Sequence, residues 1–461
     1  MSIVMKFGGT SVADAAAFDN VARIVARERE AAAPVVVVSA MSGVTDALLA
    51  AANIASLREV FDRHRAVAHE LLDDPAQFME KLSAAERRIA ELLDALALAP
   101  AERKALQDAV VSHGEILSSA LLAAVLNQRG ISARQVDARH CIITDDEYTC
   151  ATPLMTETFA SSKRELLPAI ESGVVPVLGG FIAATSKGAT TTLGRGGSDY
   201  TAALFGAALR ADEIQIWTDV TGVLTADPRV VPEAQTIERL SYIEASELAY
   251  FGAKVLHPKT IQPAIEMSIP VRICNSRAPH EPGTLVGPQT ETTPRTVKAI
   301  AHKPGVTTVQ ITSARMLGAY GFLRALFEVF ERHRTVVDVV TTSEVSVSLS
   351  LDDAQALPAI VAELEQLGTV RVEKGRAIIC VVGEGLRGTP GIAARVFSTI
   401  SDINVTLISQ GASSINFTFA IEEDRMKEAV IRLHEEFFTT RRPKTHQQNS
   451  DESIWINKGT H

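Results

Sequence analysis

The chain has 461 residues, of which 46% are hydrophobic and 22% are charged. A prior of about 150 residues per domain predicts roughly three domains, and the composition excludes a disordered or fibrous protein. Acidic residues outnumber basic residues by 55 to 45, so the net charge is −10. Binding to nucleic-acid phosphates or anionic lipid favours the opposite sign, and we therefore expect neither nucleic acid nor a membrane as a partner.

The four cysteines lie far apart in the sequence and form no CxxC pair: Cys141, Cys150, Cys274 and Cys380. This spacing supports neither a disulfide framework nor a zinc site, and it favours a reducing compartment. The N-terminus has no basic segment followed by a long apolar one, and no run of 18 apolar residues occurs. We therefore expect a cytoplasmic protein without a signal peptide or a membrane span.

Short apolar runs alternate with amphipathic stretches over residues 1–277. The runs cover residues 3–7, 35–38, 174–178, 213–217 and 271–273. This alternation predicts an α/β domain with a mostly parallel sheet between helical layers. Between about residues 57 and 129, Ala, Leu, Glu and Arg recur at helical spacing with almost no glycine, which predicts a helical insertion.

A second architecture follows a segment rich in proline and glycine, residues 278–296, which we interpret as a linker. Beyond it the chain repeats at a period of about 70 residues, so that Gly321 aligns with Gly391 and the alternating strand 345–351 with 415–421. Each copy continues into an amphipathic helix. The pattern predicts two ferredoxin-like α+β units and a mobile polar tail, at residues 297–375, 376–440 and 441–461.

One glycine motif suggests a nucleotide site that the context argues against. Gly383, Gly385 and Gly388 match GxGxxG after an apolar strand, and Asp402 follows the first glycine by nineteen residues. In a dinucleotide site the acidic residue ends the second strand, whereas Asp402 precedes an apolar run. Only about 70 residues remain, too few for a dinucleotide-binding domain. We therefore predict that these glycines form turns.

Two other glycine-rich segments suit an anion. No GxxxxGK[ST] motif occurs, which excludes a P-loop. KFGGTS places Lys6 and two glycines after the first predicted strand, where an ammonium and accessible backbone amides favour negative charge. In LGRGGSD, glycines surround Arg195, while Ser198 and Asp199 open the next predicted helix. A helix N-terminus and a guanidinium suit a carboxylate or a phosphate, and helix capping alone leaves Arg195 unexplained.

Three further segments place charged residues near predicted turns: HGE at 113–115, the stretch 218–229, and FGAKVLHP at 251–258. We expect HGE at the start of a helix. Together the segments supply cations and acids from Lys6, Arg195, Arg229, Lys254, Glu115, Asp199 and Asp219. Because ligands of open α/β sheets bind outside the carboxyl ends of the strands, this set indicates phosphoryl transfer from a nucleotide.

Six motifs follow one another in the order and at the separations typical of aspartate kinases: KFGGTS, VVVVSAMSGVTDALL, SHGEILSS, GRGGSDYTAAL, WTDVTGVLTADPRV and FGAKVLHPKTI. The sequence thus resembles the monofunctional aspartate kinases with two C-terminal ACT domains, over residues 1 to about 438. The resemblance implies an amino-acid-kinase fold that uses ATP and Mg²⁺ to phosphorylate the side-chain carboxylate of L-aspartate. The product, 4-phospho-L-aspartate, leads toward lysine, methionine and threonine.

The resemblance also implies roles for single residues. Lys6 would stabilise charge on the phosphoryl group in transfer, and Asp199 would organise the reacting groups. Arg195 would hold the α-carboxylate of aspartate and Glu115 its ammonium, in a site lined by Ser39, Thr45, Phe181, Gly196, Gly197 and Ser198. The nucleotide positions of the family correspond to Lys6, Gly8, Gly9, Thr218, Asp219, Leu224, Arg229, Lys254 and Val255. Leu224 is a departure, since relatives can carry an aromatic residue there near the adenine.

The C-terminal units resemble paired ACT domains, which bind small amino acids at their mutual interface. The first unit matches the effector site of lysine-sensitive enzymes at Met316, Gly321, Leu323, Asp338, Ser343 and Glu344. The resemblance implies inhibition by L-lysine, because carboxylates such as Asp338 and Glu344 favour its ε-ammonium. Threonine is the alternative effector, and turn polarity is the alternative interpretation of these residues. Edge-to-edge pairing of such units between chains predicts at least a homodimer.

Two other functions stay open at this point. A related kinase of the same fold that acts on glutamate would not need HGE, GRGGSD and a double ACT tail together. A non-catalytic amino-acid sensor would not need to keep Lys6, Glu115, Arg195, Asp199 and Lys254, which are all present. Aspartate kinase is therefore the function that the sequence favours.

Overall fold

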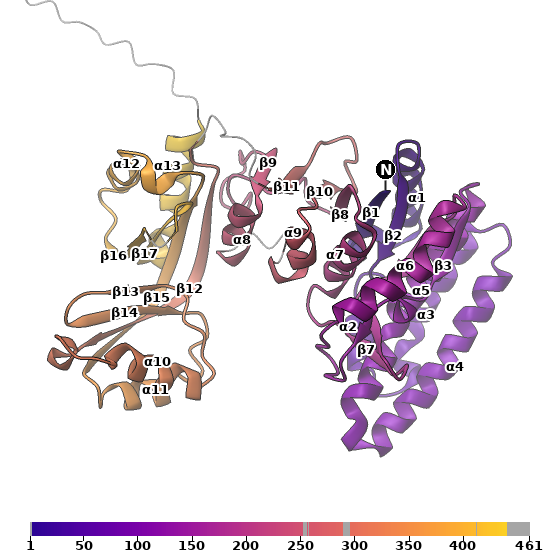
Figure 1. The fold of residues 1–461 in the computed structure, drawn as a ribbon, viewed down its shortest axis with the longest axis horizontal. Coiled ribbons are helices and arrows are strands. Elements are labelled where there is room, and N and C mark those ends of the chain that lie inside the picture. The colour runs from indigo at the N-terminus through magenta and orange to yellow at the C-terminus, as the bar shows by residue number, and fades with distance from the viewer. Residues whose placement is uncertain (1, 252–255, 257, 289–295, 412, 440–461) are drawn as a thin grey trace, which may run out of the picture.

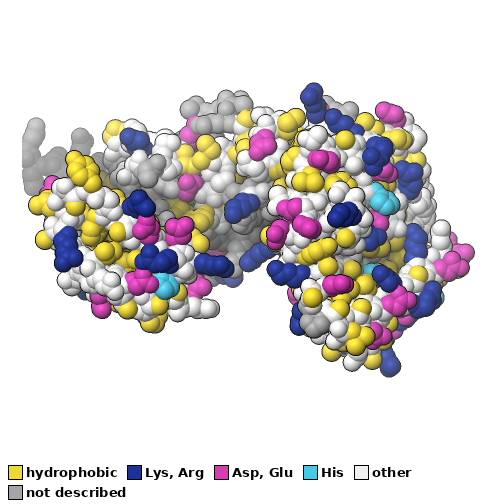
Figure 2. All heavy atoms as spheres, turned by 60° about the horizontal axis from the view of Figure 1, so that its bottom comes forward, with side chains coloured by type: hydrophobic (Ala, Val, Ile, Leu, Met, Phe, Trp, Pro, Cys, Tyr) yellow, Lys and Arg dark blue, Asp and Glu magenta, His cyan; other side chains and the backbone are white. Residues whose placement is uncertain are grey.

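Two lobes lie along the long axis of the molecule (Figure 1). The computed structural model describes residues 2–251, 256, 258–288, 296–411 and 413–439. The N-terminal lobe comprises residues 2–288, and the C-terminal lobe comprises residues 296–439. On the face seen in Figure 2, basic and acidic side chains are interspersed over both lobes.

An eight-stranded sheet forms the centre of the N-terminal lobe, in the order β3-β5-β2-β1-β8-β10-β11-β9. All neighbouring strands are parallel except β10 and β11. The strands are β1 (Ser2–Phe7), β2 (Ala33–Val38), β3 (Ala133–Val136), β5 (Val175–Gly179), β8 (Glu213–Thr218), β9 (Arg239–Ser241), β10 (Val271–Asn275) and β11 (Thr284–Gly287). The five strands predicted from apolar runs are thus confirmed, and the carboxyl ends of β1, β2, β5 and β8 share one edge.

Helices cover both faces of this sheet (Figure 1). They are α1 (Ala15–Arg29), α2 (Val44–Ala50), α3 (Arg58–Leu71), α4 (Ala76–Leu98), α5 (Arg103–Gln128), α6 (Met155–Glu171), α7 (Gly197–Leu209), α8 (Tyr242–Tyr250) and α9 (Gln262–Glu266). A small second sheet contains β4 (Ile143–Thr144), β6 (Ile182–Thr185) and β7 (Thr190–Thr192). Helices α3, α4 and α5 fill the stretch in which the sequence predicted a helical insertion.

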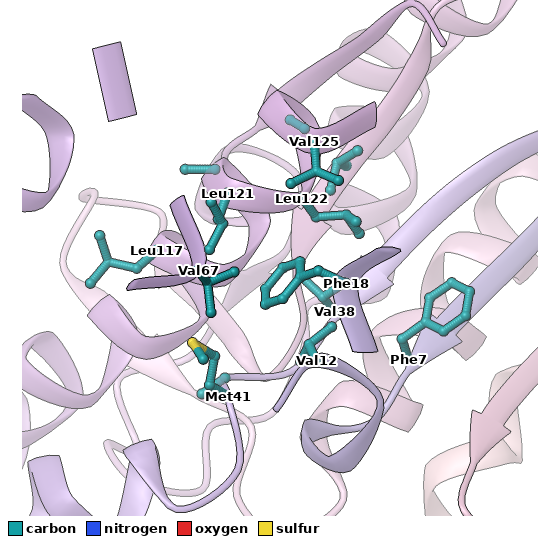
Figure 3. Packing of buried hydrophobic residues seen from close by; sticks show 14 of the residues in the cluster. Phe7, Val12, Phe18, Val38, Met41, Val67, Leu117, Leu121, Leu122 and Val125 are labelled. Atoms are coloured by element: carbon teal, nitrogen blue, oxygen red, sulfur yellow. The ribbon is translucent and has the colours of Figure 1, made fainter. Parts of the chain in front are cut away.

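Helix α5 is the core helix of the N-terminal lobe. Its side chains Leu117, Leu121 and Val125 are buried in the same hydrophobic cluster as Phe18 of α1 and Val38 of β2 (Figure 3). Among the described residues, α5 alone is long and apolar enough to cross a membrane, yet 78% of its most apolar 18-residue stretch is buried inside the protein. Such burial is that of a helix packed in a protein core.

Part of the segment interpreted as a linker belongs to the main sheet instead. Strand β11 follows a chain reversal at Gly283, whose φ of +64° suits glycine. A Cβ atom there would lie 2.0 Å from the carbonyl oxygen of Ile273. Pro279, Pro282 and Gly283 therefore lie in the connection between the antiparallel strands β10 and β11, and residues 289–295 lie outside the described residues.

The C-terminal lobe contains one six-stranded antiparallel sheet, in the order β13-β14-β12-β15-β17-β16. Its strands are β12 (Ala299–Thr312), β13 (Val340–Thr342), β14 (Ser346–Leu351), β15 (Thr369–Val382), β16 (Val405–Gln410) and β17 (Asn416–Glu422). Its helices are α10 (Phe322–Arg332), α11 (Leu357–Leu364), α12 (Ile392–Thr399) and α13 (Met426–Phe438).

The two long strands β12 and β15 run through both halves of this sheet. Residues 306–312 of β12 pair with 369–376 of β15 in the first unit, whereas residues 299–303 pair with 378–382 beside β17 in the second. The segment that completes the second unit therefore precedes the first unit in the chain. The predicted tail, 441–461, lies outside the described residues.

The GxGxxG glycines form a turn, as predicted. Gly383 follows β15, Gly385 adopts a left-handed conformation, and a short 3-10 helix ends at Gly388 before α12 begins. Strand β15 is antiparallel to both of its neighbours. This arrangement differs from the parallel βαβ unit that a dinucleotide site requires.

Candidate active site

A cavity of about 300 Å³ opens at the carboxyl edge of the main sheet. Its lining comes from β1, α2, α5, the segments after β2 and β5, and the start of α7. The residues are Lys6, Ser39, Thr45, Glu115, Phe181, Gly194, Arg195, Gly196, Gly197, Ser198 and Asp199. Folding thus brings together every residue that the sequence predicted for catalysis or aspartate binding.

Lys6 and Asp199 form an ion pair on the wall of this cavity. The Lys6 Nζ atom, at the end of β1, lies 2.7 Å from Oδ1 of Asp199 in the first turn of α7. The two side chains are 12% and 17% exposed. The carboxylate therefore fixes the position of an ammonium that remains accessible to a ligand anion.

Glu115 is a buried acid whose carboxylate is only half satisfied. Its Oε1 atom accepts a hydrogen bond from the backbone N–H of Ala40, over 3.2 Å, while Oε2 has no hydrogen-bond partner among the described residues. Burial raises the pKa of Glu115 to about 8. A ligand ammonium would supply the missing partner.

The expected position of HGE at a helix start is wrong, because residues 113–115 lie in the middle of α5. Gly114, in the middle of α5, permits close packing against the segment after β2. A Cβ atom on Gly114 would come within 2.8 Å of the Cβ of Ala40, so glycine allows α5 to approach the segment after β2. The same approach carries Glu115 into the cavity.

The GRGG turn leaves a guanidinium and a helix N-terminus available. Gly194 and Gly196 have φ values of +71° and +75°, which favour glycine. Arg195 between them is exposed and forms no ion pair with a described residue. Helix α7 begins after Gly196 without a side-chain cap, which excludes a pure capping role for Ser198. The N–H of Gly197 donates to the carbonyl of Gly194 over 3.0 Å, so the N–H groups of Ser198 and Asp199 are the ones at this helix N-terminus that can bind an anion.

Two further contacts fix the shape of the cavity. The Ser39 hydroxyl donates to Ser198 Oγ over 3.0 Å, which joins the segment after β2 to α7. Phe181 has the unusual φ of +67°, and its backbone N–H donates to Thr201 Oγ1 over 3.0 Å. Gly197 lies against Phe181, since a Cβ there would be 2.8 Å from the ring.

The predicted nucleotide positions are only partly brought together. The backbone N–H of Gly8 donates to the carbonyl of Trp217 over 3.1 Å, so Thr218 and Asp219 follow beside the KFGGTS turn. Arg229 lies farther along, where its side chain is 84% exposed and pairs with Asp227 at 2.6 Å. Leu224 forms an isolated bridge with Thr236. Lys254 and Val255 lie outside the described residues.

The predicted effector residues all belong to the first C-terminal unit, and they differ in burial. Met316 is partly buried at a 3-10 turn, whereas Gly321, Leu323, Ser343 and Glu344 are exposed. Asp338 is different, because it lines a cavity of about 910 Å³ between the lobes, together with Tyr250 and Phe251 at the end of α8.

Asp338 already has partners from both lobes. The Tyr250 hydroxyl donates to Oδ1 of Asp338, and the Nζ atom of Lys303 lies 3.4 Å from its Oδ2. The Lys303 ammonium also lies 4.9 Å from the centre of the Tyr250 ring. Burial is the largest influence on Asp338 and raises its pKa. Neither Tyr250 nor Lys303 belongs to a motif or pattern from which this contact could be predicted.

Comparisons with known proteins agree with this arrangement. The amino acid kinase family matches residues 1–275, and an ACT domain family matches residues 379–437. Lysine-sensitive aspartokinase 3 of Escherichia coli is 39% identical over 450 residues, which cover 95% of this chain and 99% of that protein. This chain belongs to the aspartokinase family. Chloroplastic aspartokinase 1 of Arabidopsis thaliana is 40% identical, over 95% of this chain and 80% of its own length.

Solved structures show the same similarity over both lobes. The crystal structure of E. coli aspartokinase III in complex with aspartate and ADP, called the R-state, has a TM-score of 0.81 at 38% identity and covers 95% of this chain and 100% of its own. The lysine and aspartate complex of that enzyme, called the T-state, has a TM-score of 0.80 and covers 95% and 99%. The fold and the aspartate kinase activity implied by the motifs are therefore confirmed.

Proposed function

We propose that L-aspartate binds in the cavity between Arg195 and Glu115 and accepts the γ-phosphoryl group of ATP beside Lys6. One observation carries this assignment. The same cavity is lined by a guanidinium that has no ion-pair partner, and by a buried carboxylate oxygen that has no hydrogen-bond partner, within the part of the chain that the structure describes. An α-amino acid presents the complementary carboxylate and ammonium.

The chemistry follows from charge and position. The side-chain carboxylate of aspartate attacks the γ-phosphorus atom, a new O–P bond forms, and ADP leaves with the electrons of the broken O–P bond. Negative charge on the transferring group is stabilised by the Lys6 ammonium and by the backbone N–H of Gly9, since the N–H of Gly8 donates to the carbonyl of Trp217. Asp199 holds Lys6 in place through the 2.7 Å ion pair. These residues would thus act in catalysis by positioning the reacting groups and by stabilising negative charge on the phosphoryl group.

We infer that Mg²⁺ accompanies the nucleotide. The described residues contain no group of three or more His, Cys, Asp or Glu side chains that could hold a metal ion. This fits magnesium in kinases, which binds one or two carboxylates and takes its other ligands from phosphates and water. Asp199 in the cavity and Asp219 after β8 are the candidate carboxylates. The bound ion would neutralise charge on the phosphates.

ADP release in the presence of aspartate or glutamate tests the substrate assignment. We expect release with aspartate and Mg²⁺·ATP, and only a background rate with glutamate. Equal rates with both amino acids would contradict the specificity of the cavity. No release with either would favour a sensor that has kept the kinase fold.

We propose L-lysine as the feedback inhibitor, bound with its ε-ammonium at Asp338. Support comes from the burial of this carboxylate and from Lys303, which already places an ammonium 3.4 Å away. An effector ammonium would replace Lys303 at Asp338, and the contact with Tyr250 of α8 would carry the change to the kinase lobe. Differential binding of lysine to two states is the thermodynamic requirement.

Lysine titration of an Asp338→Ala variant tests this regulation. Uninhibited activity should remain within about twofold of wild type, while the lysine concentration for half inhibition rises at least about tenfold. Asp353→Ala, at an exposed position of the same unit, is the matched control and should respond like wild type. Full activity of the wild type in millimolar lysine, or inhibition by threonine instead, would contradict the proposal.

We propose a homodimer, or a higher assembly, formed through the first C-terminal unit. Strand β13 lies at the edge of the sheet, and apolar side chains in it and just before it are exposed, with Val340 at 37% and Val336 at 73%. Edge strands and clustered apolar side chains favour association. Light scattering should give at least twice the chain mass, and Val336→Asp should lower the measured mass.

We also place the enzyme in the cytoplasm, which is consistent with its four free cysteines. Cell fractionation tests this location.

A further inference from the structure

Asp108 is a buried acid on α5 that lies outside the cavity. It is seven residues before Glu115, about two helical turns along the same helix. Its side chain is 1% exposed, and no described cation pairs with it. Burial raises the pKa of Asp108. A buried carboxylate without a cation costs stability relative to an apolar residue, so its presence here points to a role in holding other groups in place.

The Asp108 carboxylate accepts three hydrogen bonds from two segments. Oδ2 accepts from the backbone N–H of Thr149, over 2.8 Å, and from the backbone N–H of Thr192, over 3.0 Å. Oδ1 accepts from the Thr192 hydroxyl over 2.8 Å. Thr149 has a φ of +75°, which is uncommon for a residue with a side chain. One carboxylate therefore ties a strained loop and the end of β7 to α5.

Thr192 leads directly into the turn that carries Arg195. Its carbonyl accepts from the N–H of Ala151 over 2.9 Å, which closes the connection between the two segments. Gly194 then packs against the same loop, because a Cβ there would lie 3.2 Å from Cys150 Sγ. Contacts that begin at Asp108 therefore hold the turn in place as far as Gly194, the residue before Arg195.

We propose that Asp108 is a positioning residue that fixes Arg195 relative to Glu115. This inference rests on the proposed function, in which these two groups hold the carboxylate and the ammonium of one aspartate. Helix α5 carries Glu115 directly and sets the Arg195 turn through Asp108 and Thr192. The distance between the two charged groups of an α-amino acid is nearly constant, so a displacement of the turn by about 1 Å weakens one of the two contacts.

Two substitutions at the contact test the role. Asp108→Asn replaces an acceptor by a donor toward Thr192, and Thr192→Val removes the hydroxyl at nearly constant volume. Each should raise the KM for aspartate, by about tenfold for Asp108→Asn and less for Thr192→Val, with the KM for ATP unchanged. Thr192→Ser keeps the hydroxyl, so this variant should have an aspartate KM close to that of wild type. A role confined to folding predicts a lower thermal midpoint with an unchanged aspartate KM, and that result would overturn the inference.

A double-mutant cycle separates this inference from the proposed function. In an Arg195→Ala background, Asp108→Asn should raise the aspartate KM less than about twofold, because the group it positions is absent. Equal effects in both backgrounds would overturn the positioning role. An unchanged aspartate KM in Arg195→Ala alone would instead contradict the proposed function. If Asp108→Asn does not fold, the same cycle is run with Thr192→Val.

Discussion

Two lysine–carboxylate pairs in this molecule have nearly the same geometry and different surroundings. The Nζ atom of Lys6 lies 2.7 Å from Oδ1 of Asp199, and the Nζ atom of Lys298 lies 2.8 Å from Oε2 of Glu244. The first pair lines the cavity at the carboxyl edge of the main sheet. The second is sealed, with its side chains 8% and 1% exposed. Their separations do not distinguish them, but their access to a ligand does.

The sealed pair joins the two lobes. Glu244 forms a capping box with Ser241 at the start of α8, and its Oε2 also accepts from the Lys298 ammonium. The backbone N–H of Lys298 donates to the carbonyl of Val382 in the C-terminal sheet over 2.8 Å. A ligand cannot replace either partner without opening this interface, whereas a phosphate can compete for Lys6. A buried ion pair therefore indicates function only where a cavity reaches it.

Breaking the sealed pair should have the largest effect. Lys298→Met leaves the Glu244 carboxylate buried without its cation, which should lower the free energy of unfolding by about 3–5 kcal/mol. Urea unfolding followed by circular dichroism measures the change. The double variant Lys298→Met, Glu244→Gln should recover most of it, because no unpaired charge remains. A single variant as stable as wild type would show that the pair does not hold the lobes together.

Removing the accessible lysine should affect turnover instead of stability. Lys6→Ala should lower kcat about 100- to 1000-fold, the usual cost of one lost group that stabilises charge in the transition state, with the aspartate KM nearly unchanged. Coupled detection of ADP gives both constants, and the thermal midpoint should stay near that of wild type. Turnover within a few-fold of wild type would make Lys6 a structural turn residue.

Arg195 extends the comparison to a cation that forms no ion pair with any residue the structure describes. Arg195→Lys keeps the charge but loses the planar fork that binds a carboxylate through two hydrogen bonds. The aspartate KM should therefore rise about tenfold or more, while the ATP KM changes little. Initial rates over a matrix of both substrate concentrations separate the two constants. An unchanged aspartate dependence would move the carboxylate site elsewhere.

Glu115 provides the smallest and most specific effect, a pH dependence. Because burial raises its pKa to about 8, the carboxylate is ionised above this pH and protonated below it. The substrate ammonium needs the ionised form, so the aspartate KM should rise about fivefold between pH 8 and pH 7. Lys6, Arg195 and Asp199 are the other charged groups that line the same cavity. Glu115→Gln should give a high aspartate KM without this slope; a slope that persists would assign the titration to another group.

The sequence predicted the fold best where one segment carries the signal. Apolar runs identified five central strands, and the glycine-rich motifs supplied residues that line one cavity. HGE was misplaced because glycine usually weakens a helix, whereas Gly114 allows α5 to pack against Ala40. Lys298 and Glu244 are 54 residues apart, and Asp108 reaches Thr192 across 84 residues. Such partners meet only through tertiary packing, which periodicity and local motifs do not encode.

The interleaved strands of the C-terminal lobe impose an order on its folding during synthesis. Residues 299–303 leave the ribosome before the first unit, yet their partners 378–382 and the neighbouring β17 follow about 80 to 120 residues later. Because synthesis proceeds at about 5–20 residues per second, the edge of this early strand segment stays unpaired for several seconds. The first unit can complete its own pairing in that time. The second unit contains the first strand segment of this lobe to be synthesised, yet its strand pairing is the last in the enzyme to be completed.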